Sequence, residues 1–389
     1  MPLYPPGVLP DRPRPAWFGV LVTTLFVASL VAGLGGLLRT PRPASAFENR
    51  SIAPWPAAPA TLAQWRAFPA AFERWFDDRF GLRARLVTLD HWTRAVVFGT
   101  SPVPKVLLGR DGWLYFRGED AKAFDRWYRG SEAVDGAVIA AARDELARRA
   151  DFLASRGIPF LFVVVPEKYS IYPEYLPSWA AARMARPPLD RLLEALSRVP
   201  QLHVVDLRAA LAAARGSERL YYKTDSHWNY LGATVGYEAM MREAARLLPG
   251  LAIAPVTRPS YVAGVDRYSG DLAQMLGLPA RFREDDIAPL GKILATQDAR
   301  CARREPEVMP DIETFVYRCA NPPRYSALMY RDSMAIPLVP MIAESFARTT
   351  FVTSPRLDPA LVDALKPDIV IEEMVERTTT GVAQYPMPR

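Results

Sequence analysis

Two polar segments that lie far apart in the chain contain the residue types that nucleophilic catalysis requires. Asp225 and His227 are two positions apart in YYKTDSHWNYLG, and Ser333 lies far downstream in YRDSM. A serine hydroxyl is a weak nucleophile near neutral pH, so it needs a histidine to take its proton and a carboxylate to orient that histidine. Residues two apart in an extended chain point the same way, so Asp225 can hold the imidazole while its other nitrogen faces Ser333. These residues predict acyl chemistry.

The same residues also have simpler interpretations. Ser333 precedes a helical stretch, where serine is a preferred N-cap residue, and the segment around Asp225 is compatible with a polar capping loop. Asp225 and His227 could instead bind a metal ion, but two ligands do not make a site. The other two histidines do not complete one, because His91 lies in a predicted amphipathic helix and His203 begins a predicted strand. We therefore expect no metal site.

Strand and helix patterns alternate in the region that must position these residues. A helical pattern over residues 135–156 is followed by GIPFLFVVVP, a continuous apolar run typical of a strand buried on both faces. Further strand-like runs are LHVVDL, YSALMY, TTFV and PDIVIEEM, and a helical stretch links Ser333 to Phe346. This alternation predicts an α/β fold with a mostly parallel sheet covered by helices on both faces.

The predicted fold indicates where the chemistry takes place. Ligands of such sheets bind at the carboxyl ends of the strands, and Ser333 directly follows one predicted strand. The N–H groups at the start of the following helix would stabilise an anion that forms on an attacked acyl carbon. A second helix is expected from about Leu231, with Asn229 as its cap.

The N-terminal part of the chain predicts membrane attachment. Residues 17–38 form an uncharged stretch of 22 residues, long enough to cross a bilayer as one helix. Arg12 and Arg14 precede it, which places residues 1–16 in the cytoplasm and the bulk of the chain outside. A cleavable signal peptide is the alternative, because the sequence ASA at 44–46 resembles a cleavage site, although the apolar stretch is longer than usual for such signals.

The remainder of the chain is expected to form a linker and one extramembrane domain. Residues 39–61 are rich in proline and small residues, which predicts an extended linker, and residues 62–389 contain no internal repeat. The only cysteines, Cys301 and Cys319, are expected to form a disulfide in an oxidising compartment. The formal net charge of +6 comes without any Lys/Arg-rich run, so nucleic-acid binding is not expected.

Seven blocks occur in an order that resembles a known family. In chain order they begin at Glu73, Ser101, Val165, Tyr221, Tyr268, Tyr330 and Leu365, and read ERWFDDRFGLRARLV, SPVPKVLLGRDGWLYF, VPEKYSIYPEYLP, YYKTDSHWNYLGA, YSGDLAQMLGLP, YRDSM and LKPDIVIEEMVER. Together they resemble the SGNH-hydrolase-like domain of alginate O-acetyltransferases of the AlgJ/AlgX type. The resemblance covers residues 62–377 and implies a three-layer α/β/α domain.

The resemblance also implies roles for particular residues. The family's Asp-x-His pair and downstream serine fall on Asp225, His227 and Ser333, an order permuted relative to ordinary SGNH esterases. A glycine commonly precedes the Asp-Ser pair of serine blocks in this superfamily, whereas this chain has Arg331 there.

The function implied by the resemblance is acetyl transfer to hydroxyls of an exported polysaccharide, through an acetyl-serine intermediate and without a cofactor. The implied partners are a membrane-bound acyltransferase that supplies acetyl groups and a polysaccharide synthesis and export complex. We expect an inner-membrane protein whose catalytic domain lies in the periplasm. A polysaccharide acetylesterase with the same triad, and a non-catalytic polysaccharide-binding member, are the alternatives.

Five more residues are expected to contact the substrate. Lys168 ends a predicted strand, where it would steer an anionic polymer or orient the neighbouring loop; an ordinary solvated lysine is the alternative. Arg331 lies close to the nucleophile in sequence. The aromatic residues Tyr172, Tyr222 and Trp228 are candidates for stacking on sugar rings, and packing is the alternative role for them.

Overall fold

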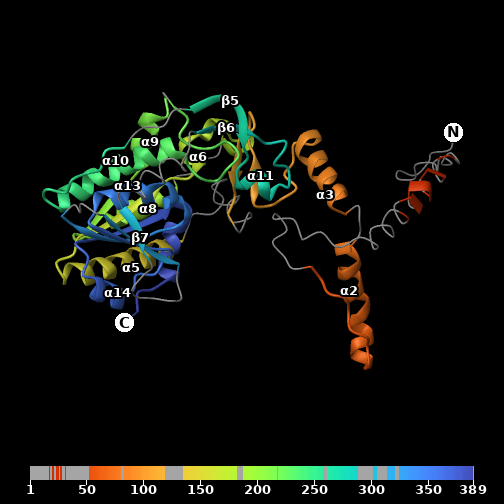
Figure 1. Cartoon of the computed structure of the whole chain (residues 1–389), viewed down its shortest axis with the longest axis horizontal. Coiled ribbons are helices and arrows are strands. Elements are labelled where there is room, and N and C mark those ends of the chain that lie inside the picture. The colour runs from red at the N-terminus through yellow and green to blue at the C-terminus, as the bar shows by residue number, and fades with distance from the viewer. Residues whose placement is uncertain are drawn as a thin grey trace, which may run out of the picture. The chain divides into compact units, whose positions relative to one another are not determined.

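The computed structural model divides the chain into two units, Met1–Pro102 and Val103–Arg389 (Figure 1). It describes single positions between residues 17 and 31 and the ranges 52–79, 83–118, 135–181, 187–216, 218–256, 261–287, 301–304, 313–319 and 324–388. The predicted domain over residues 62–389 therefore includes helices of the first unit as well as the whole of the second.

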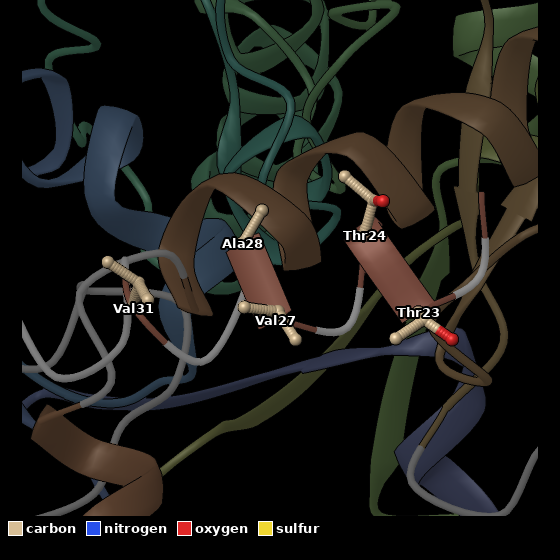
Figure 2. A pocket seen from close by; sticks show the side chains of 5 residues that line it. All are labelled: Thr23, Thr24, Val27, Ala28 and Val31. Atoms are coloured by element: carbon tan, nitrogen blue, oxygen red, sulfur yellow. The ribbon is translucent and has the colours of Figure 1, made fainter. Parts of the chain in front are cut away.

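In the described range from residue 52 onward, the helical segments of the first unit are α2 (Leu62–Arg79), α3 (Arg83–Trp92) and the π-helix η1 (Thr93–Val97). Residues 1–16, most of the predicted span over 17–38 and much of the linker lie outside the described residues. Within the described part of the chain, no helix combines the length and the apolar character that a bilayer crossing requires. The hollow drawn in Figure 2 belongs to this unit and contains none of the candidate catalytic residues; it is lined by Thr23, Thr24, Val27, Ala28 and Val31.

A seven-stranded sheet with the order β4-β3-β11-β9-β10-β8-β7 forms the centre of the second unit. Neighbouring strands from β4 to β10 pair in parallel, whereas β8 and β7 pair antiparallel at one edge. The predicted α/β fold is confirmed, with a mixed sheet. The strands are β3 (Phe160–Val165), β4 (Leu202–Asp206), β7 (Cys301–Arg304), β8 (Thr314–Cys319), β9 (Ser326–Tyr330), β10 (Arg348–Val352) and β11 (Ile369–Val375).

Helices cover both faces of this sheet, which produces two cores. Successive residues of β3 alternate between them, so Leu161, Val163 and Val165 pack in one core. Phe160, Phe162 and Val164 pack in the other. Figure 1 shows α10 and α13 on one side of the sheet and α5 and α14 on the other. The long covering helices are α5 (Gly136–Ala154), α8 (Pro188–Leu196) and α10 (Tyr230–Leu247), and the shorter ones are α9 (Arg208–Ala214), α13 (Val339–Ser345) and α14 (Pro359–Leu365).

Smaller elements lie beside the sheet. β1 (Val106–Leu108) and β2 (Leu114–Phe116) form a hairpin, and β5 (Tyr261–Tyr268) pairs with β6 (Glu284–Ile287). Short helical segments follow several strands, namely α6 (Lys168–Ile171), η2 (Pro173–Tyr175), α7 (Ser178–Ala181), α11 (Asp271–Met275), η3 (Ser333–Leu338) and η4 (Glu376–Gln384). The two ladders and the edge strands β7 and β8 were not predicted.

Two local predictions have clear outcomes. Cys301 and Cys319 face each other across the β7–β8 ladder and form the expected disulfide. The helical stretch expected between Ser333 and Phe346 is present, as the 3-10 helix η3 followed by the α-helix α13. Pro337 in η3 has no N–H group to donate to the carbonyl of Ser333, which removes one α-helical hydrogen bond from this turn.

Candidate active site

Ser333, His227 and Asp225 form a row of hydrogen bonds at the carboxyl edge of the sheet. His227 Nε2 lies 2.9 Å from Ser333 Oγ, and His227 Nδ1 lies 2.7 Å from Asp225 Oδ1. A carboxylate only accepts hydrogen bonds, so Nδ1 carries the hydrogen and Nε2 of the neutral ring accepts from the hydroxyl. Ser333 is exposed, the His227 side chain is 28% exposed and the Asp225 side chain only 8%. The nucleophile candidate therefore faces solvent and the carboxylate is buried.

The loop that carries Asp225 and His227 is fastened at its C-terminal end to the serine turn. Trp228 is buried, bridges to Tyr221 and donates from Nε1 to the carbonyl of Met334 at 2.7 Å. Asn229 caps α10 as expected, accepting from the Gly232 N–H at 3.0 Å. These contacts hold His227 opposite Ser333 although the two residues are far apart in sequence.

Lys168 binds the same loop from the interior of the protein. Its side chain is buried, and its Nζ donates to the carbonyls of Tyr222 at 3.0 Å, Lys223 at 3.0 Å and Asp225 at 2.6 Å. Burial lowers the pKa of Lys168 to about 8, although nearby carboxylates including Glu284 oppose the shift. The prediction that Lys168 contacts an anionic polymer is wrong, because its ammonium group is fully engaged inside the protein. Its alternative role in orienting the loop agrees with the contacts.

Asp332 holds the serine turn in place. Its Oδ1 accepts from the Met334 N–H at 2.7 Å and its Oδ2 accepts from the Val375 N–H at 2.8 Å, which ties the turn to the end of β11. The Met334 N–H is therefore not available to an oxyanion. No described residue accepts a hydrogen bond from the Ser333 N–H, so this group is the candidate oxyanion donor near the nucleophile.

Asp225 accepts four hydrogen bonds in its buried position. Two come from His227, through Nδ1 and the backbone N–H at 2.9 Å. The Tyr268 hydroxyl donates at 2.6 Å and the Asp271 N–H at 3.0 Å. Burial alone would raise the pKa of Asp225, but the bonds and charge of His227 and the bond from Tyr268 hold it well below its ordinary value. Burial would lower the pKa of His227, but Asp225 raises it above 6.5.

Tyr268, Gly270 and Asp271 complete the surroundings of Asp225, and their roles were not predicted. A Cβ atom on Gly270 would lie 2.4 Å from the Cβ of Asp225, so only glycine leaves room for the carboxylate. Their block, YSGDLAQMLGLP, contributed to the family resemblance, which was the one signal that could have pointed to them. Their spacing in the sequence could not have indicated these roles, because α10 and most of β5 separate them from the Asp225 loop.

Arg331 does not point to the candidate site as a free cation. It is buried, with its guanidinium group 5.2 Å from the Phe315 ring centre, 3.6 Å from Glu313 and within hydrogen-bond distance of the Asp332 carbonyl. The prediction that Arg331 binds substrate is therefore contradicted by its burial. The absence of glycine here causes no backbone strain, since among the described non-glycine residues only Asp111 and Lys366 have a positive φ.

The three aromatic candidates separate into two kinds. Tyr172 is buried against Trp113, and its hydroxyl accepts from the Leu220 N–H at 2.9 Å, so it is a core residue. Trp228 is also buried and holds the serine turn. The prediction that these two stack on sugars is wrong. Tyr222 is partly exposed and stacks on Tyr268 with ring centres 4.1 Å apart, so its contact with substrate stays a prediction.

Asp225, His227 and Asp271 also place potential ligand atoms within 4.8 Å of one another. These atoms already bond within the protein, since Nδ1 of His227 pairs with Asp225 and Oδ2 of Asp271 accepts from the Ser226 hydroxyl. The acid–base arrangement accounts for all three side chains, and we assign none of them as a metal ligand.

Parts of the chain match a described family and several named proteins. Residues 106–298 match the family described as "SGNH hydrolase-like domain, acetyltransferase AlgX". The chain is 30% identical over 184 residues to a probable alginate O-acetylase AlgJ of Pseudomonas putida, which covers 46% of this chain and 44% of that protein. It is 29% identical over 264 residues to the corresponding protein of Pseudomonas aeruginosa, covering 67% and 62%. The resemblance to AlgJ- and AlgX-type proteins is confirmed.

Each of these matches covers only part of the chain. The family match includes Asp225 and His227 but ends before Ser333. The chain spans 44% and 62% of the length of the two AlgJ relatives. A solved structure of Bacillus cereus PatB1 with a sulfonyl adduct superposes with a TM-score of 0.53 at 16% identity, covering 72% of this chain and 98% of that chain. This likeness shows a shared fold.

The contacts of Lys168 generate the first prediction. Replacing Lys168 by Met removes the donor from three carbonyls, so the free energy of unfolding should fall by about 3 kcal/mol in chemical denaturation. Activity should fall with it, because the loop carrying His227 loses its anchor. The matched control is Lys223→Met in the same loop, which should change stability by less than about 0.5 kcal/mol. Unchanged stability together with a raised KM for polymer would restore the substrate-binding role.

Proposed function

We propose that this protein is an O-acetyltransferase that places acetyl groups on hydroxyls of an exported polysaccharide. The observation that carries the proposal is the 2.9 Å contact between Ser333 Oγ and His227 Nε2, with Asp225 on the other ring nitrogen. The matching family's description as an acetyltransferase and the names of the AlgJ relatives as probable alginate O-acetylases support acetyl transfer. The exposure of Ser333 suits an acceptor as large as a polymer.

The first half-reaction loads the serine. His227 Nε2 takes the hydroxyl proton while Ser333 Oγ attacks the carbonyl carbon of an acetyl donor, and the negative charge moves to the carbonyl oxygen beside the Ser333 N–H. Asp225 stabilises the imidazolium that forms and stays ionised. The donor's leaving group then departs with the proton from His227, and an acetyl ester of Ser333 results.

The second half-reaction transfers the acetyl group. A sugar hydroxyl gives its proton to His227 Nε2 and attacks the acetyl carbonyl, so a new ester bond forms as the bond to Ser333 Oγ breaks. Ser333 recovers its proton from the imidazolium. Water in place of the sugar would release acetate, so an acetylesterase would use the same residues.

We further propose that the enzyme works at the outer side of an inner membrane. An uncharged stretch over residues 17–38 supports an uncleaved anchor there, and the Cys301–Cys319 disulfide suits the oxidising periplasm. Acetyl groups would arrive from a membrane-bound acyltransferase, and the acceptor from a polysaccharide synthesis and export complex. No cofactor takes part in either half-reaction.

Replacement of the nucleophile tests the proposed chemistry. Ser333→Ala should reduce acetyl transfer to oligosaccharide by at least about a thousand-fold, measured by mass spectrometry of the acceptor, with an unchanged thermal midpoint. Ser197→Ala removes an exposed hydroxyl elsewhere and should keep full activity. Unchanged transfer by the Ser333 variant would refute the proposal, and acetate release without transfer by the unmodified enzyme would identify an esterase.

The pH profile tests the role of His227. The base must be neutral to accept the serine proton, and Asp225 raises the pKa of His227 above 6.5. Activity should therefore fall as the pH drops through a value above 6.5, measured as kcat/KM against pH. An acid limb at or below 6.5 would contradict this assignment.

A further inference from the structure

A second carboxylate lies behind the imidazole of His227. Asp271 Oδ2 is 3.7 Å from His227 Nδ1 and accepts from the Ser226 hydroxyl at 2.5 Å. Ser226 Oγ is itself 3.2 Å from His227 Nδ1, and the Ser226 N–H donates to Asp271 Oδ1 at 2.6 Å. The Asp271 carboxylate therefore interacts electrostatically with the imidazole, and the buried Ser226 hydroxyl also links the two side chains.

The segment that carries Asp271 is fixed against the Asp225 loop. The Asp271 N–H donates to Asp225, the Gly270 N–H donates to Thr224 Oγ1 at 3.0 Å, and the Ala273 N–H donates to the Thr224 carbonyl at 3.2 Å. Gly270 also packs so closely on Asp225 that no side chain fits between them. The distance between the two carboxylates is thus set by backbone contacts.

Thr224 is also held by a residue of β6. Glu284 of β6 accepts from the N–H and the hydroxyl of Thr224 at 2.7 and 2.6 Å, and it pairs with Arg219 at 3.1 Å. Glu284 of β6 therefore holds the residue that precedes Asp225, and Tyr268 at the end of β5 donates to Asp225 itself.

Groups of both charges surround the cluster formed by Asp225, Ser226, His227 and Asp271. Asp225 and Asp271 face His227, whose pKa they raise against burial, and the Arg377 cation opposes them. Lys168 lies beneath, bonded to the carbonyl of Asp225. Tyr268, with Tyr222 stacked on it, and Glu284 are further titratable groups beside the cluster. Burial together with Asp225 raises the pKa of Asp271.

We infer that Asp271 is a positioning residue that fixes the ring of His227 through Ser226 and adds a second negative charge behind it. A single carboxylate suffices to orient the tautomer, so the second one strengthens the stabilisation of imidazolium in both half-reactions. In this role Asp271 neither takes a proton nor forms a covalent bond with a substrate. The catalytic part of this inference depends on the proposed acetyltransferase function.

The titration of His227 tests the inference directly in the full chain. Only three histidines are present, so their signals can be assigned by NMR with labelled histidine. Asp271→Asn should lower the measured pKa of His227 by roughly one pH unit, because a negative charge near the imidazolium is lost. The acid limb of kcat/KM should move to lower pH by the same amount, whereas Asp271→Glu keeps the charge and should keep both values near those of the unmodified enzyme.

A matched control separates this effect from general loss of charge. Glu243 lies 3.9 Å from Nδ1 of another histidine, His203, so Glu243→Gln removes a carboxylate elsewhere in the protein and should leave the titration of His227 unchanged. An unchanged His227 titration in folded Asp271→Asn would overturn the inference.

Ser226→Ala tests the bridge without removing the charge, and it serves if the Asp271 variant does not fold. It should lower kcat several-fold while the pKa of His227 changes little, and an unchanged kcat would refute the bridging role. The NMR titration does not require turnover. A shifted titration in a protein without acetyltransferase activity would therefore overturn the proposed function and leave the electrostatic assignment intact.

Discussion

The hydrogen bond between His227 and Ser333 depends on two loops that must be held at a fixed separation. One loop leads into α10 and the other leads from β9 into η3. The protein fixes both by buried polar contacts, the indole of Trp228 on the Met334 carbonyl and the Asp332 carboxylate on the end of β11. Each contact satisfies a backbone group that would otherwise be buried without a partner, so loss of either costs stability as well as geometry.

A buried cation supports this arrangement from within. Lys168 loses its hydration at the end of β3, and three carbonyls of the Asp225 loop replace the water. Such a group is expensive to bury, and it is retained where several fixed dipoles converge on it. The carboxylate of Asp225 then lies between the loop it belongs to and the β5–α11 segment, which supplies Tyr268 and Asp271 as donors. The electrostatics of His227 are therefore set by three separate parts of the chain.

The central strands and the meeting of Asp225, His227 and Ser333 could be predicted from the sequence. Buried strands such as β3 and β11 appear as continuous apolar runs, and strand order along the chain indicates the edge where Ser333 emerges. The ladders β1–β2 and β5–β6 could not be predicted from the sequence, since their strands are short or polar and depend on tertiary contacts. Lys168 shows a different limit: a lysine after a strand has the same sequence signature whether it faces solvent or three carbonyls. Asp271 was missed because only the fold brings its segment to His227.

The account's central claim is that Ser333 carries the acetyl group during transfer. Incubation of the full chain with an activated acetyl ester, rapid quenching and peptide mass spectrometry would locate any covalent acetyl group. We predict one acetyl group on the peptide containing Ser333, absent in His227→Ala, because the serine then has no base. Acetylation of another residue, or acetylation of Ser333 that is independent of His227, would contradict the account.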